Sequence, residues 1–249
     1  MPGTGCAGCR NGNALDFGFT MAFQPIVDVE TRTVFAHEAL VRGPAGEGAH
    51  SILSKVGPHN RYAFDQACRV RAIELASALD MQSHLSINFL PNAVYRAEAC
   101  IRLTLETAER CGFPIHRIMF ELLEDERSQD LEHLTSIFTE YARRGFTTAI
   151  DDFGAGFAGF EFLAAFQPHI IKIDMQLIRN VHTDRVRRTI VEGLVRIARG
   201  LDTRVVGEGV ECREEVDVLR EMGVTLFQGY VFAKPGLATL PVVDWSAIS

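Results

Sequence analysis

Oxygen-bearing side chains recur where short apolar runs of this chain end. The runs are rich in Val, Ile, Leu and Phe, and each of them ends near one or two polar residues. In chain order these residues are Glu38, Asn88, Glu121, Asp151 with Asp152, Lys172 with Asp174, Glu208 and Gln228. If the runs are the strands of a barrel, their carboxyl ends meet at one rim, and we expect these side chains to lie together.

A cluster of carboxylates at one rim predicts a site for divalent cations. Burying several like charges together costs free energy unless a cation compensates them. Oxygen ligands without a His or Cys cluster favour Mg²⁺ or Mn²⁺ over zinc. A set of this size can hold two ions, and such a pair is used for in-line displacement at phosphorus with a bridging water as the nucleophile. The residues therefore predict cleavage of a phosphodiester.

Two alternatives stay open for single members of this set. Any one of them could be a lone polar residue where a strand becomes a loop, although this does not account for the whole set. Lys172 could stabilise charge on a phosphate or orient the attacking water. It could instead pair with Asp151 or Asp174 for structural reasons alone.

Alternation of strands and helices would bring these residues together. Eight β-rich runs are separated by segments with a helical period. The runs are AFQPIVDV, VFAHEALV, HLSINFL, RIMFELL, FTTAIDD, HIIKID, RVVGEGV and LFQGYVF. Two helical faces have apolar residues at steps of three and four, and they consist of Leu131, Leu134, Phe138 and Tyr141, and of Val186, Ile190, Leu194, Ile197 and Leu201.

This pattern predicts an α/β fold, a modified eight-stranded TIM-type (β/α) barrel. The first two strands are joined only by Glu30-Thr31-Arg32-Thr33, which is too short for a helical crossover and predicts a hairpin. The first strand should therefore run antiparallel to its neighbours. We expect residues 21–249 to form one domain, and residues 1–20 to be an N-terminal extension.

Composition limits the class of protein. Hydrophobic residues make up 47% of the chain and charged residues 23%, which is ordinary for a globular domain. No run approaches the ~20 apolar residues of a membrane span, and the first residues lack the features of a secretion signal. We therefore expect a cytoplasmic protein without a membrane partner. The net charge of −7 argues against binding a nucleic-acid polymer, whereas a bound cation would still allow a phosphate substrate.

The six cysteines and eight histidines form no complete metal-binding motif. Cys6-Ala7-Gly8-Cys9 is a lone CxxC, whereas a zinc site needs about four ligands. A zinc site shared across a dimer, a redox pair and an inert tail all remain open for it. We expect reduced thiols in a cytosolic chain of this size, and the histidines are scattered without ligand spacing.

The strings that contain these residues resemble the EAL domain, the cyclic di-GMP phosphodiesterase module of bacteria. The tripeptide that names it is Glu38-Ala39-Leu40, within HEALVRG. Further matching strings are FQPIVD at 23–28, INFLP at 87–91, ELLE at 121–124, DDFGAGF at 151–157, IKID at 171–174, EGVE at 208–211 and QGY at 228–230. The resemblance spans about residues 21–235. The sequence of this region is most similar to that of EAL domains attached to blue-light-sensing flavin (BLUF) domains. We nevertheless expect the EAL domain of this chain to stand alone.

The resemblance implies hydrolysis of cyclic di-GMP to linear pGpG with Mg²⁺ or Mn²⁺, and with two ions. The implied metal ligands are Glu38, Asn88, Glu121, Asp151, Asp152 and Glu208. The implied catalytic residues are Glu38, Lys172 and Glu208, and it stays open whether Glu208 also accepts a proton. The implied substrate-binding residues are Gln24, Arg42, Asp174, Glu211 and Gln228. Glu124 corresponds to the glutamate that stabilises the loop after the paired aspartates.

The loop after Asp152 departs from the family pattern. It reads FGAGFAG, where a form with threonine, tyrosine and serines is more usual, and Leu123 replaces a common threonine. The resemblance implies a homodimer to which this loop contributes, so the departure bears on regulation through the dimer more than on the chemistry. Two alternatives to the proposed hydrolysis stay open. One is a catalytically weak cyclic di-GMP receptor or protein-binding regulator, and the other is hydrolysis of another cyclic dinucleotide or of pGpG.

Overall fold

A mixed β-barrel forms the centre of the molecule in a computed structural model that describes residues 15–91, 94, 100–123, 131–155 and 159–248. The strands in this part are β1 (Thr20–Asp28), β2 (Thr33–Arg42), β3 (His84–Phe89), β4 (Ile118–Leu123), β5 (Thr147–Phe153), β6 (Ile170–Ile173), β7 (Arg204–Gly207), β8 (Leu226–Phe227) and β9 (Gly236–Leu237). The helices are α2 (Ala49–Leu53), α3 (Arg61–Ala78), α5 (Arg102–Cys111), α6 (Leu131–Arg143), α7 (Gly159–Ala165), α8 (Met175–Ile178), α9 (Arg185–Gly200), α10 (Arg213–Glu221) and the short 3₁₀ helices η2 (Ile115–Arg117) and η4 (Ser246–Ile248).

The predicted barrel and its antiparallel first strand are confirmed. The strand order is β2-β3-β4-β5-β6-β7-β8-β1-β9, and β1 also pairs with β2, which closes the barrel. β1 runs antiparallel to β2 and β8, whereas β2 to β8 pair in parallel. In the hairpin, the Asp28 carboxylate accepts the N–H groups of Glu30 at 3.1 Å and Thr31 at 3.3 Å. The sequence does not predict β9, because a strand of two residues has no periodic pattern.

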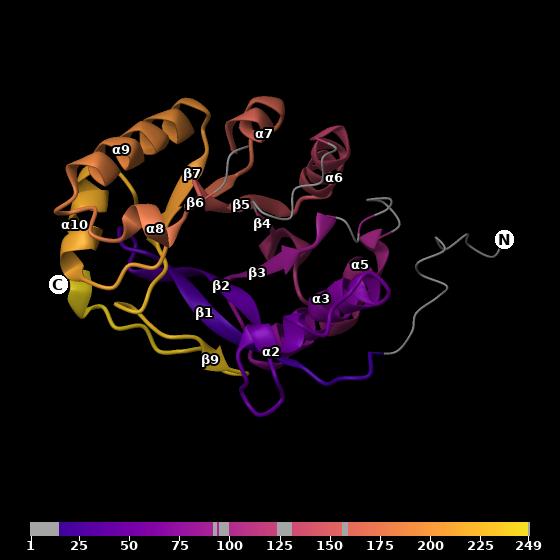
Figure 1. The fold of residues 1–249 in the computed structure, drawn as a ribbon. Coiled ribbons are helices and arrows are strands. Elements are labelled where there is room, and N and C mark those ends of the chain that lie inside the picture. Colours follow the sequence, from indigo (N-terminus) through magenta and orange to yellow (C-terminus); the bar gives the residue numbers. More distant parts are fainter. Residues whose placement is uncertain (1–14, 92–93, 95–99, 124–130, 156–158, 249) are drawn as a thin grey trace.

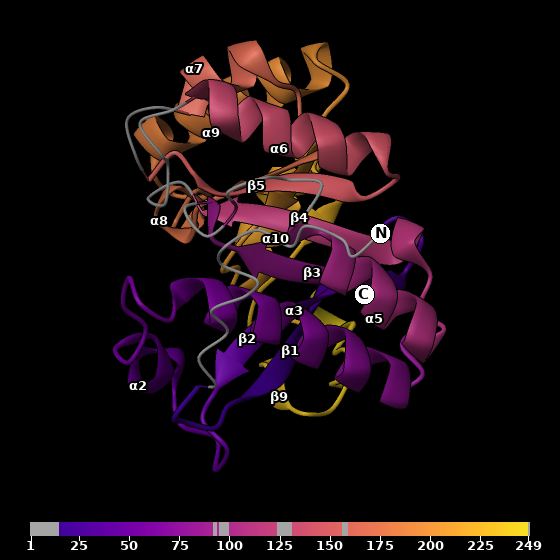
Figure 2. The same cartoon turned by 90° about the vertical axis from the view of Figure 1, so that its right-hand side faces the viewer.

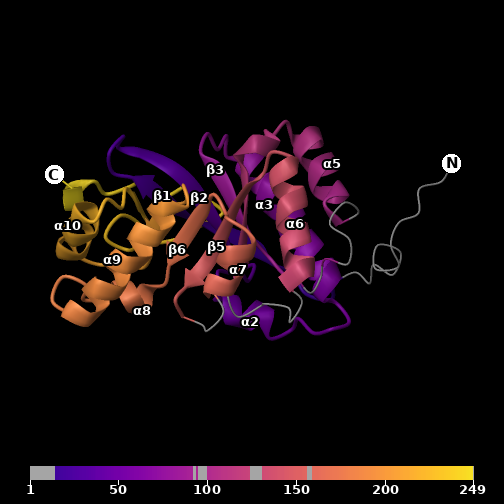
Figure 3. The same cartoon turned by 90° about the horizontal axis from the view of Figure 1, so that it is seen from above.

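Helices cover the outside of the barrel (Figures 1 and 3). α3, α5 and α6 lie on one side, and α8, α9 and α10 lie on the other (Figure 3). α6 buries Leu134, Phe138 and Tyr141 of its predicted face. No helix within the described ranges combines the length and the apolar character needed to cross a bilayer.

The face that α9 buries differs from the predicted one. Val186, Ile190 and Ile197 are exposed, with Val186 at 68%. The helix instead buries Val191, Val195 and Ala198 against the barrel. Both sets of residues have helical spacing, so periodicity alone does not distinguish them. Of the predicted face, only Leu194 packs against the core, so the prediction is largely wrong for this helix.

Two apolar clusters lie on opposite sides of the barrel wall. Figure 2 shows the twisted strands that form this wall. The larger cluster fills the space between the strands and the helices. The smaller one lies within the barrel and consists of Ile26, Ala36, Met119, Ala149, Ile170, Val206 and Leu226. It closes the barrel interior below the carboxyl ends of the parallel strands.

A buried ion pair links α3 to the end of β3. The Arg69 side chain is fully buried, and its guanidinium lies 2.7 Å from the Asp65 carboxylate and 3.1 Å from the Tyr141 hydroxyl. Asp65 also accepts the N–H group of Leu90 at 3.0 Å, just beyond the end of β3. The pair therefore fixes the backbone two residues after Asn88.

Replacing Arg69 with methionine should lower the free energy of unfolding by about 3–5 kcal/mol, because Asp65 would keep a buried and uncompensated charge. Chemical denaturation measures this loss. The matched control is Arg110→Met, which removes an exposed ion pair with Glu74 of 2.7 Å and should cost less than about 1 kcal/mol. Similar losses in the two variants would contradict the structural role of the buried pair.

Candidate active site

Strand periodicity places the predicted site residues in one layer of the barrel interior. Side chains two positions apart on a strand point to the same side. Each residue of the inner apolar cluster therefore has a polar residue two positions away, on its strand or directly after the strand's end, that faces the same interior. The pairs are Ile26 with Gln24, Ala36 with Glu38, Met119 with Glu121, Ala149 with Asp151, Ile170 with Lys172, Val206 with Glu208 and Leu226 with Gln228. The apolar layer closes the barrel, and the polar layer lies above it at the mouth.

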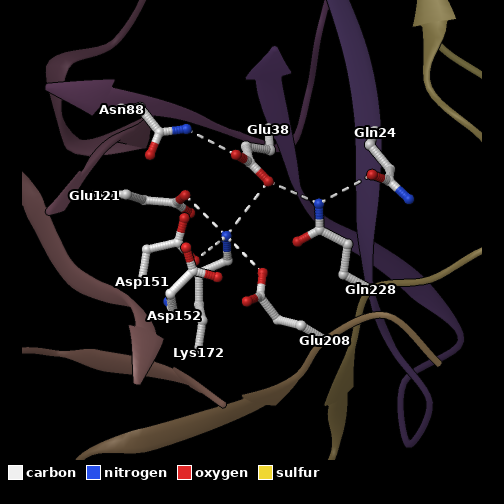
Figure 4. Close-up of polar contacts among 9 residues, drawn as sticks. All are labelled: Gln24, Glu38, Asn88, Glu121, Asp151, Asp152, Lys172, Glu208 and Gln228. Carbon is white, nitrogen blue, oxygen red and sulfur yellow. Dashed lines mark hydrogen bonds and ion pairs between the residues drawn. The ribbon is translucent and has the colours of Figure 1, made fainter. Parts of the chain in front are cut away.

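Lys172 lies at the centre of the polar layer (Figure 4). Its Nζ is 2.8 Å from a carboxylate oxygen of Glu208 and 3.3 Å from one of Glu38. It is 2.9 Å from an oxygen of both Glu121 and Asp151. Burial alone would lower the pKa of Lys172, but these carboxylates raise it well above its usual value. The lysine is therefore a buried cation that contacts four carboxylates.

Amide side chains hold Glu38 in position (Figure 4). Asn88 donates its Nδ2 to Oε1 of Glu38 at 2.7 Å, and Gln228 donates its Nε2 to Oε2 at 2.8 Å. Nε2 of Gln228 also lies 3.4 Å from Oε1 of Gln24. Burial alone would raise the pKa of Glu38, but Lys172 and the two amides lower it. Glu38 is therefore held as a carboxylate anion.

The neighbouring aspartates reach the same site because β5 is irregular. The pairing of β5 with β6 shifts between Ile150 and Phe153, and Asp152 has a φ of 52°, which is uncommon for a residue other than glycine. Adjacent residues of a regular strand point to opposite faces, and irregular pairing of this kind re-aims a side chain. One oxygen each of Asp151, Asp152 and Glu208 lie within 4.8 Å of one another.

The site holds more negative charge than Lys172 compensates. Burial, together with the neighbouring carboxylates, raises the pKa of Glu121 to about 8 and that of Asp152 to about 7. Burial and Asp151 also raise the pKa of Glu208 well above its usual value. Protonation is one way to relieve this repulsion, and a divalent cation is the other, since it stabilises all of the ionised carboxylates.

The donor atoms of this layer fit such a cation. Asn88 uses its amide N–H to bind Glu38, and its Oδ1 is buried without a hydrogen-bond partner among the described residues. A buried polar atom without a partner costs about 1–3 kcal/mol. Oxygens of Glu38, Glu121 and Asp151 form a second group within 4.8 Å, which shares Asp151 with the first. Grouped carboxylate and amide oxygens are the ligands that Mg²⁺ and Mn²⁺ prefer.

Two cavities flank the carboxylates. The first, of about 320 Å³, is lined by Glu38, Asp151, Asp152, Glu208 and residues of the loops after β6, β7 and β8. The second, of about 290 Å³, lies toward α2 and α3. Glu38 and Asp151 line both cavities. The carboxylate cluster therefore lies between two hollows rather than at the end of one.

Four of the predicted substrate residues line these cavities. Gln24, Glu211 and Gln228 line the first cavity, and Arg42 lines the second. Asp174 is buried and accepts the N–H group of Gln176 at 2.8 Å at the start of α8. Its role toward a substrate stays a prediction.

Several predictions concern residues outside the described ranges. Glu124 lies in the segment 124–130 and Cys6 and Cys9 lie in 1–14, so their assignments stay predictions. The loop expected to contribute to a homodimer includes residues 156–158, and the homodimer also stays a prediction. Within the described ranges, Cys68, Cys100, Cys111 and Cys212 form no disulfide bond, and the reduced state of the thiols stays a prediction.

The sequence analysis did not identify some residues of the first cavity. Tyr230 is 56% exposed at its edge, with the Lys234 ammonium 5.5 Å from the ring centre. Gly209 has a φ of 63°, and a Cβ there would lie 2.5 Å from Cβ of Met175. The strings QGY and EGVE contain both residues. The sequence analysis selected charged and amide side chains at strand ends, so it selected neither a tyrosine nor a glycine.

Sequence comparison connects the chain with bacterial signalling proteins. The profile of the family described as EAL domain matches residues 13–235. The blue light- and temperature-regulated antirepressor BluF of Escherichia coli K12 is 31% identical over 225 residues, which are 90% of this chain and 56% of BluF. Other relatives from that organism are named as a cyclic di-GMP phosphodiesterase, PdeL, and as probable cyclic di-GMP phosphodiesterases, PdeD and PdeG. The chain spans about half the length of these curated relatives.

Solved structures share the fold over most of the chain. A standalone versatile EAL protein from Vibrio cholerae O395, in its c-di-GMP-bound form, is 52% identical with a TM-score of 0.92 and covers 95% of this chain and 100% of its own. BlrP1 of Klebsiella pneumoniae, in a complex with calcium and cyclic di-GMP, is 30% identical with a TM-score of 0.85. That comparison covers 93% of this chain and 60% of BlrP1.

Proposed function

The chain belongs to the EAL domain family, and we propose that it is a metal-dependent phosphodiesterase that hydrolyses cyclic di-GMP to linear pGpG. The observation that supports this best is the pair of carboxylate groups that share Asp151 at the barrel mouth. The similarity to structures that contain cyclic di-GMP, with calcium in one of them, supports the nucleotide and a divalent cation. Family membership and the similarity to BluF confirm the resemblance found in the sequence.

We infer that the cations are Mg²⁺ or Mn²⁺ and that two of them bind. The residues that would hold them are Glu38, Asn88, Glu121, Asp151, Asp152 and Glu208. When bound, such ions stabilise charge on the phosphate and lower the pKa of a coordinated water. The chain supplies the fixed carboxylates and the unpartnered Oδ1 of Asn88, and the apolar layer below excludes water from the rest of the barrel.

Lys172 and Glu208 are the residues we assign to charge stabilisation and proton transfer. Four carboxylates fix the Lys172 ammonium, so its charge is preorganised for a phosphate or for the attacking water. Glu208 is the most exposed of those four carboxylates and lines the first cavity. It is therefore the carboxylate best placed to exchange a proton with water.

The two cavities suit a ligand with a base on each side of its phosphates. We propose that Gln24, Glu211 and Gln228 contact the ligand in the first cavity. Arg42 lines the second cavity, and its guanidinium can bind a phosphate through two hydrogen bonds. The cleavable bond would then lie above Glu38 and Asp151, which line both cavities.

A catalytically weak cyclic di-GMP receptor or protein-binding regulator is the second candidate. The similarity to BluF favours it, because BluF is an antirepressor. The candidates differ in the fate of the nucleotide, so a chromatographic assay with Mg²⁺, Mn²⁺ and Ca²⁺ in parallel separates them. We expect pGpG with Mg²⁺ or Mn²⁺ and none with a chelator. Tight binding of nucleotide that stays intact would favour the receptor.

Mg²⁺ should stabilise the protein against unfolding, by about 2.7 kcal/mol at one hundred times its dissociation constant. Glu121→Gln should remove most of this gain, because it removes a buried ligand. The variant should not destabilise the metal-free protein, because the raised pKa of Glu121, about 8, leaves this group largely uncharged at neutral pH, and glutamine is a neutral group of the same shape. Thermal unfolding with and without Mg²⁺ measures both effects. An equal Mg²⁺-dependent shift in the variant would argue against Glu121 as a ligand.

A further inference from the structure

A second group of metal-ligating side chains lies apart from the carboxylate cluster. His182, Cys212 and Glu215 each offer one ligand atom, and the three atoms lie within 4.8 Å of one another. His182 lies between α8 and α9, whereas Cys212 is the N-cap residue of α10 and Glu215 belongs to its first turn. α8, α9 and α10 are neighbours at one end of the molecule (Figures 1 and 3). The sequence gives no indication of this group, because His182 and Cys212 lie 30 positions apart.

Two backbone N–H groups orient the Glu215 carboxylate. The residue is 1% exposed. Its Oε1 accepts the N–H group of Asn180 at 2.9 Å, and its Oε2 accepts that of Glu211 at 2.9 Å. Each carboxylate oxygen has two lone pairs, so each can still bind a cation. Carboxylates that ligate metals are held by hydrogen bonds of this kind.

A purely structural role of Glu215 does not explain the surroundings of the His182 imidazole. Its Nδ1 is buried and has no hydrogen-bond partner within the described part of the chain. Such a nitrogen costs about 1–3 kcal/mol, which a ligand would offset. The Cys212 thiol contacts the Glu214 carboxylate, which lies beside the group and can serve as a further oxygen donor.

We propose that His182, Cys212 and Glu215 bind one transition-metal ion of the zinc type, at a site separate from the carboxylate cluster. Nitrogen, sulfur and oxygen donors together suit Zn²⁺ and not Mg²⁺. Metal–ligand distances of about 2.0–2.3 Å place the donors of a tetrahedral ion about 3.5 Å apart, so side-chain movements of about 1 Å would complete the site. Glu214 or water would take the fourth position.

The ion would stabilise the rim of the first cavity. Glu215 holds the backbone of Glu211, and Glu211 lines that cavity and forms an ion pair with Arg179. Arg179 follows α8 directly, in the same loop as His182. A metal bond between His182 and α10 would therefore fix both partners of this ion pair. The proposal does not depend on the hydrolysis of cyclic di-GMP.

Cobalt binding to the full chain tests the proposal. A thiolate ligand gives Co²⁺ an intense charge-transfer band in the near ultraviolet, which the sulfur-free carboxylate cluster does not give. The experiment uses a Cys6→Ser/Cys9→Ser background, so that the CxxC pair does not contribute. We expect the band to saturate at one equivalent of Co²⁺ and to disappear when Zn²⁺ is added, because Zn²⁺ binds such sites more tightly than Co²⁺.

Two variants and one control assign the band to this group. Cys212→Ser should abolish it, whereas Cys111→Ser, which changes another half-buried cysteine, should retain it. His182→Ala should weaken Co²⁺ binding by at least about tenfold, since even outer-shell partners of a metal contribute that much. The proposal is overturned if the band never appears, if it persists in Cys212→Ser, or if His182→Ala binds Co²⁺ unchanged. The optical readout uses no nucleotide, so failure of the hydrolysis assay leaves this result intact.

Discussion

Replacing Glu38 with glutamine should lower the rate of cyclic di-GMP hydrolysis by about 10³-fold. The substitution keeps the shape of the side chain and removes its charge. Glu38 faces Lys172 and accepts hydrogen bonds from Asn88 and Gln228. A glutamine amide would replace one accepting oxygen with an N–H₂ group that faces donors, and it would be a poor ligand for Mg²⁺.

The control for this variant is Glu30→Gln, which changes an exposed glutamate in the β1–β2 turn. We expect its turnover to match that of the unmodified chain. Chromatography of the products at saturating Mg²⁺ gives both rates. Unmodified turnover of Glu38→Gln would mean that the carboxylate cluster is not the catalytic site.

Lys172→Met should lower kcat by about 10²–10⁴-fold, and it should also destabilise the metal-free protein. Methionine fills a similar volume without the ammonium, which leaves Glu38, Glu121, Asp151 and Glu208 without their common cation. Their mutual repulsion in a buried site would then oppose folding. Mg²⁺ should restore most of this stability, because it supplies the missing positive charge.

The two readouts separate a catalytic from a structural role of Lys172. If the lysine only holds the carboxylates together, Mg²⁺ should restore stability and turnover together in Lys172→Met. If it acts on the phosphate or on the attacking water, Mg²⁺ should restore stability alone, and this is the result we expect. Lys55→Met changes an exposed lysine and serves as the control. Restored turnover would contradict the catalytic assignment.

The barrel and most of its polar layer are predictable from local patterns in the sequence. Each strand is a short apolar run, and the residue of interest lies two positions from an inner apolar residue. Ala149 and Asp151 show this on β5, and Ile170 and Lys172 show it on β6. Since the spacing follows from the pleat of a strand, it needs no knowledge of distant contacts.

Other features depend on contacts that no local pattern encodes. The side of α9 that packs on the barrel depends on how the helix docks in three dimensions, so Val191 and Val195 are buried whereas Val186, a residue of the same type, is exposed. Asp152 reaches the site through an irregular backbone with a positive φ. His182 approaches Cys212 only because two loops after neighbouring strands meet.

The most direct test of the proposed hydrolysis is a single-turnover experiment with the protein in excess over cyclic di-GMP. The nucleotide and its products are separated by chromatography after incubation with saturating Mg²⁺ or Mn²⁺. We predict complete conversion to linear pGpG, which is lost with a chelator and in Glu38→Gln. If the protein binds cyclic di-GMP tightly and the nucleotide is recovered uncleaved after prolonged incubation, the proposed hydrolysis is contradicted and the chain is a receptor.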